Sequence, residues 1–473
     1  MHRVVVIGSG VSGLASARLL LDIRPDAEVI VVEASSRHGG PIRSEQVDGF
    51  TVEVGPSGFL NRHPSTLRLA RRLGLDDRVV TGCEQMRRRY ILSGGRLRRF
   101  PDSLKTFLST DLLTWRGRAR MMLEPFIPPR LSDSDDTIGS FARRRLGDEA
   151  AEMLVDPVVS GIYAGDADHL SLHATFPQLA KIDRDGRSLL RSLLLARHRP
   201  DATPASPTTM GRRRYVSFQN GLGELVDALA ASLGERLRLN SPVETIERCH
   251  TGWRVEVGGQ DAETIDADTV ILATPHHVTQ RLIGMLDPRI DTLCEGVQTA
   301  PAAVVALGYR EADVPHPLQG FGYLVPRVEG SRVLGVLWST SIFPGHRARP
   351  GHVLFQAVQG GARHKDICDE DDVTLISRIR MQLANAMSLR GEPVLARVYR
   401  HPGGLPQYHI GHTERLRAAD EALRNLPGLF VTGNAFRGVG INACTADAER
   451  IAEHLQAYLD TVTPSGLDVS EVA

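Results

Sequence analysis

The chain has 473 residues, about three times the length of a typical domain, so we expect two or three compact units. Hydrophobic residues account for 42% and charged residues for 24%, an ordinary globular composition that argues against long disordered or collagen-like segments. Basic and acidic residues balance at 56 each, so no overall positive field would attract nucleic acid, and we expect no nucleic-acid partner.

Cysteine spacing and hydropathy bear on the location of the protein. The five cysteines are scattered, with no CxxC pair and no His at metal-ligand spacing, so we expect free thiols, a reducing compartment and no metal site. Strand-like residues 4–7 follow Met1 almost directly, and no apolar run approaches the roughly 18 residues of a spanning helix. These features predict a cytoplasmic protein without a signal peptide.

The N-terminal part of the chain has the pattern of a βαβ unit. Strand, glycine turn, helix and strand are predicted in this order over residues 3–7, 8–13, 14–22 and 28–33. A second helix is predicted over residues 64–73, and Gly74 follows it as glycine commonly follows a helix.

The pattern changes over residues 88–214, where helix-like stretches are separated by Pro and Gly. This predicts an inserted, mostly helical region, with helices over 136–146 and 188–198 and a mobile loop over 200–207. A helix and two strands are then predicted over residues 222–233, 253–257 and 269–273.

A second sheet is predicted between residues 276 and 402, because strand-like alternation recurs there. Its clearest strands are predicted over residues 303–309, 333–338 and 353–358. A last strand and a last helix are predicted over residues 429–432 and 442–459.

The glycine turn reads Gly8-Ser9-Gly10-Val11-Ser12-Gly13, a GxGxxG sequence between strand and helix. The first glycine permits the tight turn, the second lets the backbone approach a pyrophosphate, and the third lets helix and strand pack closely. Glu33 ends the next strand, where a carboxylate accepts hydrogen bonds from ribose hydroxyls and disfavours a 2′-phosphate. A structural glycine turn is the alternative, but the combination predicts a bound dinucleotide other than NADP.

The chain continues with Arg37-His38-Gly39-Gly40-Pro41-Ile42-Arg43 and then with Glu53-Val54-Gly55-Pro56-Ser57. These segments resemble the flavoprotein family that contains amine oxidases, phytoene desaturases and protoporphyrinogen oxidases. In that family such a turn leads from the ribose to the flavin. Pro41 stands where the family usually has Arg or Lys. The resemblance implies FAD as the cofactor.

Three distant segments resemble bacterial protoporphyrinogen oxidases in particular. They are Ser160-Gly161-Ile162-Tyr163-Ala164-Gly165-Asp166, Gly320-Phe321-Gly322-Tyr323-Leu324-Val325-Pro326 and Gly433-Asn434-Ala435-Phe436-Arg437-Gly438-Val439-Gly440-Ile441. The resemblance spans residues 3–456 and implies an α/β fold, in which a Rossmann-type FAD-binding domain is joined by a second mixed-sheet substrate domain and an inserted helical region.

The expected domains follow from the predicted elements and this resemblance. We expect a discontinuous FAD-binding domain over residues 1–87, 215–275 and 425–460 and a helical, membrane-contacting insertion over residues 88–214. A substrate domain is expected over residues 276–424 and a flexible tail over residues 461–473.

The resemblance also implies two sets of site residues. The implied cofactor-binding residues are Gly8, Ser9, Gly10, Val11, Ser12, Gly13, Glu33, Ala34, Gly40, Pro41, Gly55, Pro56, Ser57, Gly58, Val243, His401, Val439, Gly440 and Ile441. The implied substrate-binding residues are Arg89, Gly161, Leu324, Leu337 and Val358.

A porphyrinogen is an apolar macrocycle with carboxylates at one edge, so its site needs an apolar slot and a fixed cation. Arg89 fits the cation role, because guanidinium pairs bidentately with a carboxylate. Without the resemblance, the sequence around Arg89 would indicate a solvated surface charge. Leu324, Leu337 and Val358 would likewise be interpreted as ordinary core residues. His401 stands where the family often has Trp, and a structural role is its alternative.

The resemblance implies that the protein oxidises protoporphyrinogen IX to protoporphyrin IX in haem synthesis, by three hydride transfers to flavin with oxygen as acceptor, giving hydrogen peroxide. The alternative substrates are coproporphyrinogen III, an amine or a polyene. A further alternative is that the protein is a flavin-bearing binding factor without turnover. We recognise no catalytic residue and no general base; tautomerisation of the macrocycle can release the protons.

Residues 100–107 and 112–127 combine aromatic and apolar side chains with arginines, for example Trp115, Arg116 and Phe126, as an interfacial helix does. An amphipathic helix on the core is the alternative. The resemblance implies peripheral contact with the inner face of the cell membrane, and a homodimer.

Overall fold

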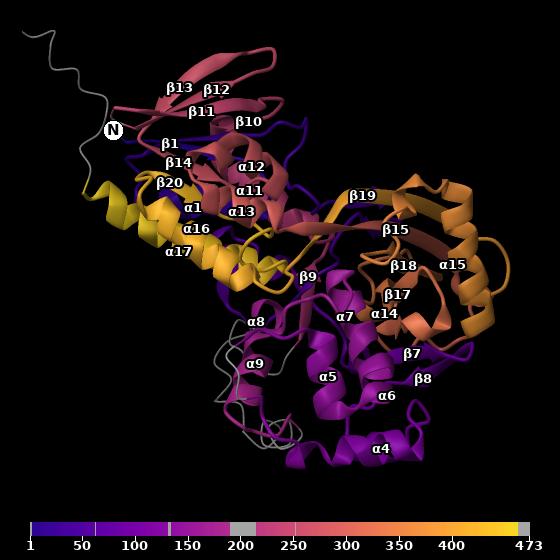
Figure 1. The fold of residues 1–473 in the computed structure, drawn as a ribbon. Coiled ribbons are helices and arrows are strands. Elements are labelled where there is room, and N and C mark those ends of the chain that lie inside the picture. Colours follow the sequence, from indigo (N-terminus) through magenta and orange to yellow (C-terminus); the bar gives the residue numbers. More distant parts are fainter. Residues whose placement is uncertain (1, 62, 131–133, 190–213, 251, 462–473) are drawn as a thin grey trace, which may run out of the picture.

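The computed structural model describes residues 2–61, 63–130, 134–189, 214–250 and 252–461 (Figure 1). Figure 1 shows a parallel sheet with its helices at the upper left, a second sheet at the right and a helical region below. None of the helices in these ranges is both long and apolar enough to cross a membrane. The predicted helix over 188–198, the loop over 200–207 and the tail over 461–473 lie largely or wholly outside the described residues.

The first sheet has five parallel strands, which come from distant parts of the chain. In sheet order they are β10 (Leu237–Arg238), β2 (Glu28–Val32), β1 (Arg3–Ile7), β14 (Thr269–Leu272) and β20 (Leu429–Val431). Four successive residues are buried in each of β1, β2 and β14, as expected for a parallel sheet that is covered on both faces. The βαβ unit predicted at the N-terminus is confirmed.

Three helices bury their apolar residues against one face of this sheet, where Val4, Val6, Val29 and Val31 lie. They are α1 (Val11–Ile23), α11 (Gly223–Leu233) and α17 (Ile441–Leu459). Because α1 and α17 share this hydrophobic cluster, the two helices lie on the same face of the sheet.

The opposite face, with Val5 and Ile7, is covered by a small antiparallel sheet and by three helices. These elements are β11 (Val243–Cys249), β12 (Gly252–Val257), β13 (Glu263–Ala267), α12 (His276–Ile283), α13 (Pro288–Glu295) and α16 (His412–Arg424). Residues 276–295 and 412–424 were expected in the substrate domain, yet their helices pack on the parallel sheet. They pack there because their buried residues Leu282, Ile290 and Leu293 belong to the hydrophobic core on this face of the parallel sheet.

The second sheet has seven strands and is antiparallel except for the pair β16–β7. In sheet order they are β19 (Leu395–Gln407), β15 (Gln298–Arg310), β18 (His352–Gly360), β17 (Val333–Trp338), β16 (Gly322–Leu324), β7 (Tyr90–Ser93) and β8 (Arg96–Arg99). Strands predicted over 303–309, 333–338 and 353–358 are confirmed within it.

Strands β7 and β8 come from the start of the region that was expected to be helical. Gly94 and Gly95 join them with positive φ angles of 58° and 73°, which is the two-residue hairpin turn that glycine favours. The helical region therefore begins only after Arg99. The Gly-Gly pair between two short alternating runs was the overlooked signal.

Side chains alternate across a strand, and one face of the seven-stranded sheet is buried under α15 (Asp372–Met387). Tyr323, Val336, Trp338 and Phe355 point to that covered face. The other face is turned away from α15, and the candidate substrate residues described below belong to it.

The helical region includes the predicted helix over 136–146. Its helices are α3 (Leu104–Leu108), α4 (Trp115–Met122), α5 (Ile138–Leu146), α6 (Asp148–Ala150), α7 (Asp156–Tyr163), α8 (Leu172–Thr175) and α9 (Pro177–Arg184), with a short π-helix at Ala151–Val155. The remaining regular elements are β3 (Ser44–Val47), β4 (Phe50–Glu53), β5 (Phe59–Leu60), α2 (Ser65–Arg72), β6 (Val79–Thr81), β9 (Tyr215–Phe218) and α14 (Ser339–Ile342).

Candidate active site

The glycine turn connects β1 to α1, and its glycines meet different surroundings. A Cβ atom at Gly13 would overlap the carbonyl oxygen of Gly8, so only glycine lets helix and strand approach here. A Cβ atom at Gly10 would meet no protein atom within 4 Å. Gly10 precedes α1, and no side chain of the described residues caps the first N–H groups of the helix, which are therefore available to an anionic group.

Glu33 follows β2 and accepts hydrogen bonds from two serines. The backbone N–H and the hydroxyl of Ser9 both donate at 2.8 Å, and those of Ser35 donate at 2.9 and 2.8 Å. Partial burial raises the pKa of Glu33, but these hydrogen bonds outweigh it and hold the pKa below its ordinary value. Glu33 is therefore an anion at neutral pH. Ser241 donates its N–H to the Glu33 carbonyl at 2.8 Å, so the segment that leads into Val243 meets the chain at the end of β2.

The segments that follow Glu33 return to the glycine turn. The N–H of Gly39 donates to the carbonyl of Ser9 at 2.8 Å, and Gly39 pairs with Gly10 as an isolated parallel bridge. A Cβ atom at Gly55 would overlap the carbonyl oxygen of Pro41. Gly10, Pro41 and Gly55, which are distant in sequence, therefore lie along one continuous strip.

The last helix, α17, begins beside this strip. Gly440 precedes it without a side-chain cap, and a Cβ atom there would meet no protein atom within 4 Å. The preceding turn is held by Tyr408, whose hydroxyl donates to the Asn434 carbonyl at 2.5 Å and accepts the N–H of Gly438 at 2.7 Å. Val439 packs beside the helical region and Ile441 lies in the core under the parallel sheet.

These residues fit a dinucleotide cofactor. Two helices begin without a side-chain cap, at glycines whose Cβ positions are free of protein atoms, and an ionised carboxylate lies at the end of β2. Of the predicted cofactor residues, the structure places Gly8, Ser9, Gly10, Val11, Ser12, Gly13, Glu33, Ala34, Gly40, Pro41, Gly55, Val243, Val439, Gly440 and Ile441 in or directly beside these segments.

The predicted apolar substrate residues share one face of the seven-stranded sheet. Gly335 pairs with both Leu324 and Val358, and Leu337 lies two residues further along β17, so the three side chains point away from α15. A Cβ atom at Gly161 would lie 2.5 Å from the Leu324 side chain, so α7 passes directly against this face. We call the half-buried surface of Leu324, Leu337 and Val358 the substrate face.

Arg89 lies at the edge of the substrate face, two residues before Ile91, which pairs with Leu324. Its guanidinium lies 5.4 Å from the ring centre of Phe321. The side chain is exposed, yet the surrounding protein atoms desolvate it and lower its pKa. No carboxylate of the described residues lies within ion-pair distance of it. Among these residues Arg89 is therefore an unpaired, partly desolvated cation, to which an anionic ligand would bind favourably.

Pro56, Ser57 and Gly58 continue the Gly55 segment toward the substrate face. The Ser57 hydroxyl lies 2.8 Å from the hydroxyl of Tyr215, and burial raises the pKa of Tyr215 to about 12. The Tyr215 ring meets Phe321 edge-on at 5.1 Å, and Phe321 in turn lies under Arg89. Tyr215 thus connects the cofactor segment to the predicted cation. Sequence reasoning missed it because no local motif surrounds residue 215.

His401 lies on β19 and donates its Nε2–H to the carbonyl of Val54 at 2.8 Å. Its partner in the structure is therefore the protein loop over residues 54–58. Gln356, which sequence reasoning also missed, donates its Nε2–H to the next carbonyl, that of Gly55, at 3.0 Å.

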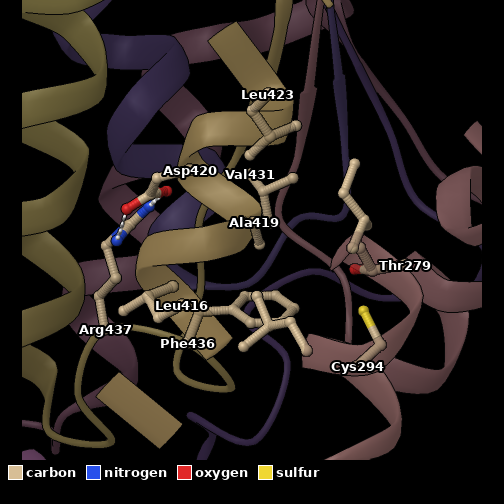
Figure 2. A pocket seen from close by; sticks show the side chains of 11 residues that line it. Thr279, Cys294, Leu416, Ala419, Asp420, Leu423, Val431, Phe436 and Arg437 are labelled. Carbon is tan, nitrogen blue, oxygen red and sulfur yellow. Dashed lines mark hydrogen bonds and ion pairs between the residues drawn. The ribbon is translucent and has the colours of Figure 1, made fainter. Parts of the chain in front are cut away.

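A small pocket between α12, α13 and α16 is a separate feature. Figure 2 shows it lined by Thr279, Cys294 and Phe436, with an ion pair between Arg437 and Asp420 at its rim. It encloses about 10 Å³, which is room for one water molecule. It therefore cannot hold a porphyrinogen, and it lies apart from the substrate face.

Comparisons with known proteins agree with this geometry. Coproporphyrinogen III oxidase of Bacillus subtilis (strain 168) is 32% identical over 468 residues, covering 97% of this chain and 98% of the relative. The chloroplast protoporphyrinogen oxidase 1 of Arabidopsis thaliana is 30% identical and covers 96% of this chain and 88% of the relative. A solved structure from Exiguobacterium sp. 255-15, provisionally named a protoporphyrinogen oxidase, has a TM-score of 0.81 at 28% identity, covering 97% of this chain and 99% of that one.

The family model described as flavin containing amine oxidoreductase matches residues 11–456. A flavin bound through a dinucleotide-binding turn is FAD, so the family and the geometry together assign this cofactor. The chain belongs to the flavin containing amine oxidoreductase family.

Proposed function

We propose that this flavoenzyme oxidises protoporphyrinogen IX to protoporphyrin IX, with oxygen as the electron acceptor. The observation that carries the proposal is Arg89, an exposed cation at the edge of an apolar sheet face, near the cofactor segment and without a carboxylate within ion-pair distance among the described residues. An apolar macrocycle with carboxylates at one edge matches this combination of a cation and apolar residues. Relatives along nearly the full chain are named protoporphyrinogen and coproporphyrinogen III oxidases, which supports a tetrapyrrole substrate.

The residues of the chain would bind and orient the macrocycle. Arg89 would pair with a propionate, and Leu324, Leu337 and Val358 would cover the rings and exclude water. Bound FAD would supply hydride acceptance and reoxidation by oxygen. The macrocycle loses six hydrogen atoms in three two-electron steps, and three O₂ become three H₂O₂.

Coproporphyrinogen III is the second candidate, because the relatives with that name include one of 32% identity. It carries carboxylates around more of its edge than protoporphyrinogen IX does. On the substrate face some of these charges would lie against apolar side chains such as Leu337 and Val358, at a desolvation cost. This favours protoporphyrinogen IX as the substrate.

The test is porphyrin fluorescence from the purified, FAD-loaded protein in aerated buffer. Protoporphyrinogen IX, coproporphyrinogen III and a panel of amines are compared as substrates. We expect fluorescence with the tetrapyrroles, a higher kcat/KM for protoporphyrinogen IX and no flavin reduction by the amines. Absence of fluorescence with both tetrapyrroles would refute the proposed reaction, and a higher kcat/KM for coproporphyrinogen III would reverse the choice of substrate.

Arg89→Ala should raise KM about ten- to hundredfold, because a charge-assisted hydrogen bond contributes about 1.5–3 kcal/mol. FAD should remain bound, since Arg89 contacts Phe321 and not the glycine turn. Arg87→Ala is the matched control, because Arg87 is exposed at the end of a short 3-10 helix. Equal KM values for the two variants would remove Arg89 from the site.

We also propose that the protein works in the cytoplasm and touches the inner face of the cell membrane through α4 and the short 3-10 helix, Glu124–Phe126, that follows it. Trp115 and Phe126 are 68% and 78% exposed, and α4 has no buried residue. Arginines interleave with these side chains, and the guanidinium of Arg116 lies 5.4 Å from the Trp115 ring centre. Figure 1 shows α4 at the outer end of the helical region. Exposed aromatic residues among cations suit an anionic lipid surface.

The membrane proposal predicts that the protein sediments with anionic vesicles and less with neutral ones. The double variant Trp115→Ser/Phe126→Ser should weaken vesicle binding at least tenfold while leaving porphyrin formation in solution unchanged. Met285→Ser is a matched control, because Met285 is fully exposed on a different part of the molecule. Equal vesicle binding by the double variant and the native protein would count against this surface.

A further inference from the structure

We propose that Gln356 and His401 are positioning residues that hold the loop over residues 54–58 and thereby set the flavin against the substrate face. Neither residue was expected to act in this way, since Gln356 carried no signal in the sequence and His401 was expected to contact the cofactor. The part that concerns the substrate face rests on the proposed function, whereas the part that concerns the flavin rests on family membership.

The two side chains bind successive carbonyl groups of one loop. His401 donates Nε2–H to the Val54 carbonyl at 2.8 Å, and Gln356 donates Nε2–H to the Gly55 carbonyl at 3.0 Å. A carbonyl only accepts, so Nε2 of His401 carries a proton. The next residue, Pro56, has no N–H to offer a strand partner. The Val54 N–H donates to the Arg43 carbonyl at 2.9 Å, whereas the Val54 and Gly55 carbonyls are held by side chains from another sheet.

Both side chains lie on the same face of the seven-stranded sheet as the candidate substrate residues. Gln356 is two residues from Val358 on β18 and pairs with Leu337 on β17. Ala302 on β15 pairs with both Gly360 and His401, which gives His401 the same orientation as Val358. The sheet that presents the substrate face is thus hydrogen-bonded directly to the loop.

The other side of the loop faces the cofactor segments. Gly55 is in contact with Pro41, and the Pro41 turn lies against Gly10 at the start of α1. Gln356 is 3% exposed and Val54 is 6% exposed, so water cannot readily replace either hydrogen bond. A shift of the loop by about 1 Å would change the separation of flavin and substrate, and such a shift can reduce a rate about a hundredfold.

The test compares two pairs of variants on the full-length protein. Gln356→Met removes the hydrogen bond to Gly55 with little change in volume. Gln359→Met is its matched control, because Gln359 lies on the same strand, is fully buried and donates to the Leu375 carbonyl at 3.0 Å on the opposite face, although it also accepts a bond from Arg378. His401→Leu removes the donor to Val54, and His401→Gln retains an N–H at a similar position.

The readouts are the visible absorption spectrum of the bound flavin, the Kd for FAD from titration of the apoprotein, and the Tm. We expect Gln356→Met and His401→Leu to weaken FAD binding at least tenfold and to shift the flavin bands. Gln359→Met should lower the Tm without either effect, and His401→Gln should restore the Kd to within threefold of the native value. If Gln356→Met does not fold, the half-buried His401 pair still decides the question.

A native spectrum and Kd in both Gln356→Met and His401→Leu would overturn the proposal, as would equal flavin effects in Gln359→Met. These measurements need no porphyrinogen, so their outcome is independent of the proposed reaction. If porphyrinogen turnover is found, kcat should fall at least tenfold with KM nearly unchanged, because the substrate residues are intact. A raised KM with native kcat would contradict the role of the pair in setting the flavin against the substrate face.

Discussion

His412 illustrates how single residues stabilise the cofactor side of the molecule. It is 2% exposed, stacks on Tyr408 at a centroid distance of 4.1 Å and donates Nε2–H to the Phe436 carbonyl at 2.8 Å. Its Nδ1 atom is buried without a hydrogen-bond partner among the described residues. Together Tyr408 and His412 fix the turn that precedes α17, so the neutral imidazole helps to orient the start of that helix.

This environment predicts a loss of stability in acid. Burial is the largest influence and lowers the pKa of His412, with smaller contributions from Arg415 and Arg437; together these outweigh the hydrogen bond to Phe436 and the charge of Glu414, which raise it. Because the folded pKa lies below the unfolded value of about 6.5, the unfolded state takes up the proton first. Stability is therefore full above about pH 6.5 and falls as the pH decreases toward the folded pKa.

His412→Gln should reduce the dependence of Tm on pH between about 7 and 5, although partly buried histidines, such as His316 and His409, also have lowered pKa values. The comparison is a series of thermal melts across this range. His454→Gln, at an exposed position in α17, is the control and should retain the native slope. A native slope in His412→Gln would show that this residue does not contribute.

At the scale of elements, the strand–turn–helix unit at the N-terminus contains glycines with two different roles. Gly13 is required by the protein itself, because its Cβ position is occupied by the Gly8 carbonyl. Gly10 has no such neighbour, and its φ of −66° is open to any residue. We therefore expect glycine at residue 10 to be required by the bound cofactor and not by the fold.

The two glycines should respond differently to alanine. Gly10→Ala should leave the Tm of the apoprotein within about 2 °C of the native value, because no contact is lost, while FAD binding weakens at least a hundredfold. Gly13→Ala should destabilise the apoprotein by about 2 kcal/mol or more, since helix and strand must separate. Urea unfolding of apoprotein and FAD titration measure the two effects. A destabilised Gly10→Ala apoprotein would contradict this division.

At the scale of the whole molecule, the helical region is joined to the seven-stranded sheet by charged and polar contacts. Arg363 lies directly after β18 and pairs with both Asp156 at the start of α7 and Asp166 beyond its end. Gln407, at the end of β19, donates to the Tyr163 carbonyl at 2.8 Å. The segment from Tyr163 to Asp166 thus docks α7, and with it Gly161, onto the sheet that carries the substrate face.

Arg363→Met should loosen this docking. It leaves the buried Asp156 and the partly buried Asp166 without their common cation, which costs up to about 3 kcal/mol. We expect faster cleavage of the helical region in limited proteolysis and a lower urea midpoint. Arg417→Met is the control, because Arg417 is largely exposed and its pair with Glu421 contributes at most about 1 kcal/mol. Unchanged proteolysis of Arg363→Met would show that apolar contacts alone hold the region.

The sequence by itself was sufficient to predict the dinucleotide-binding turn and its cofactor. Gly8, Gly10, Gly13 and Glu33 lie within one βαβ unit, and the backbone geometry that they require is local, so their spacing is readable without a fold. The order of most strands and helices was predictable for the same reason. The hairpin around Gly94 was readable as well but was assigned to a helical region.

Only the tertiary structure decided how the site is assembled. Leu324, Leu337 and Val358 share a face because of the strand register, which no single segment contains. Gln356 lies 301 positions along the chain from Gly55, and His401 lies 347 positions from Val54, so no local sequence pattern indicates their hydrogen bonds. The cofactor site can be predicted because its residues lie in short contiguous motifs. The substrate face cannot be predicted in this way, because it depends on contacts that form only when distant strands pair.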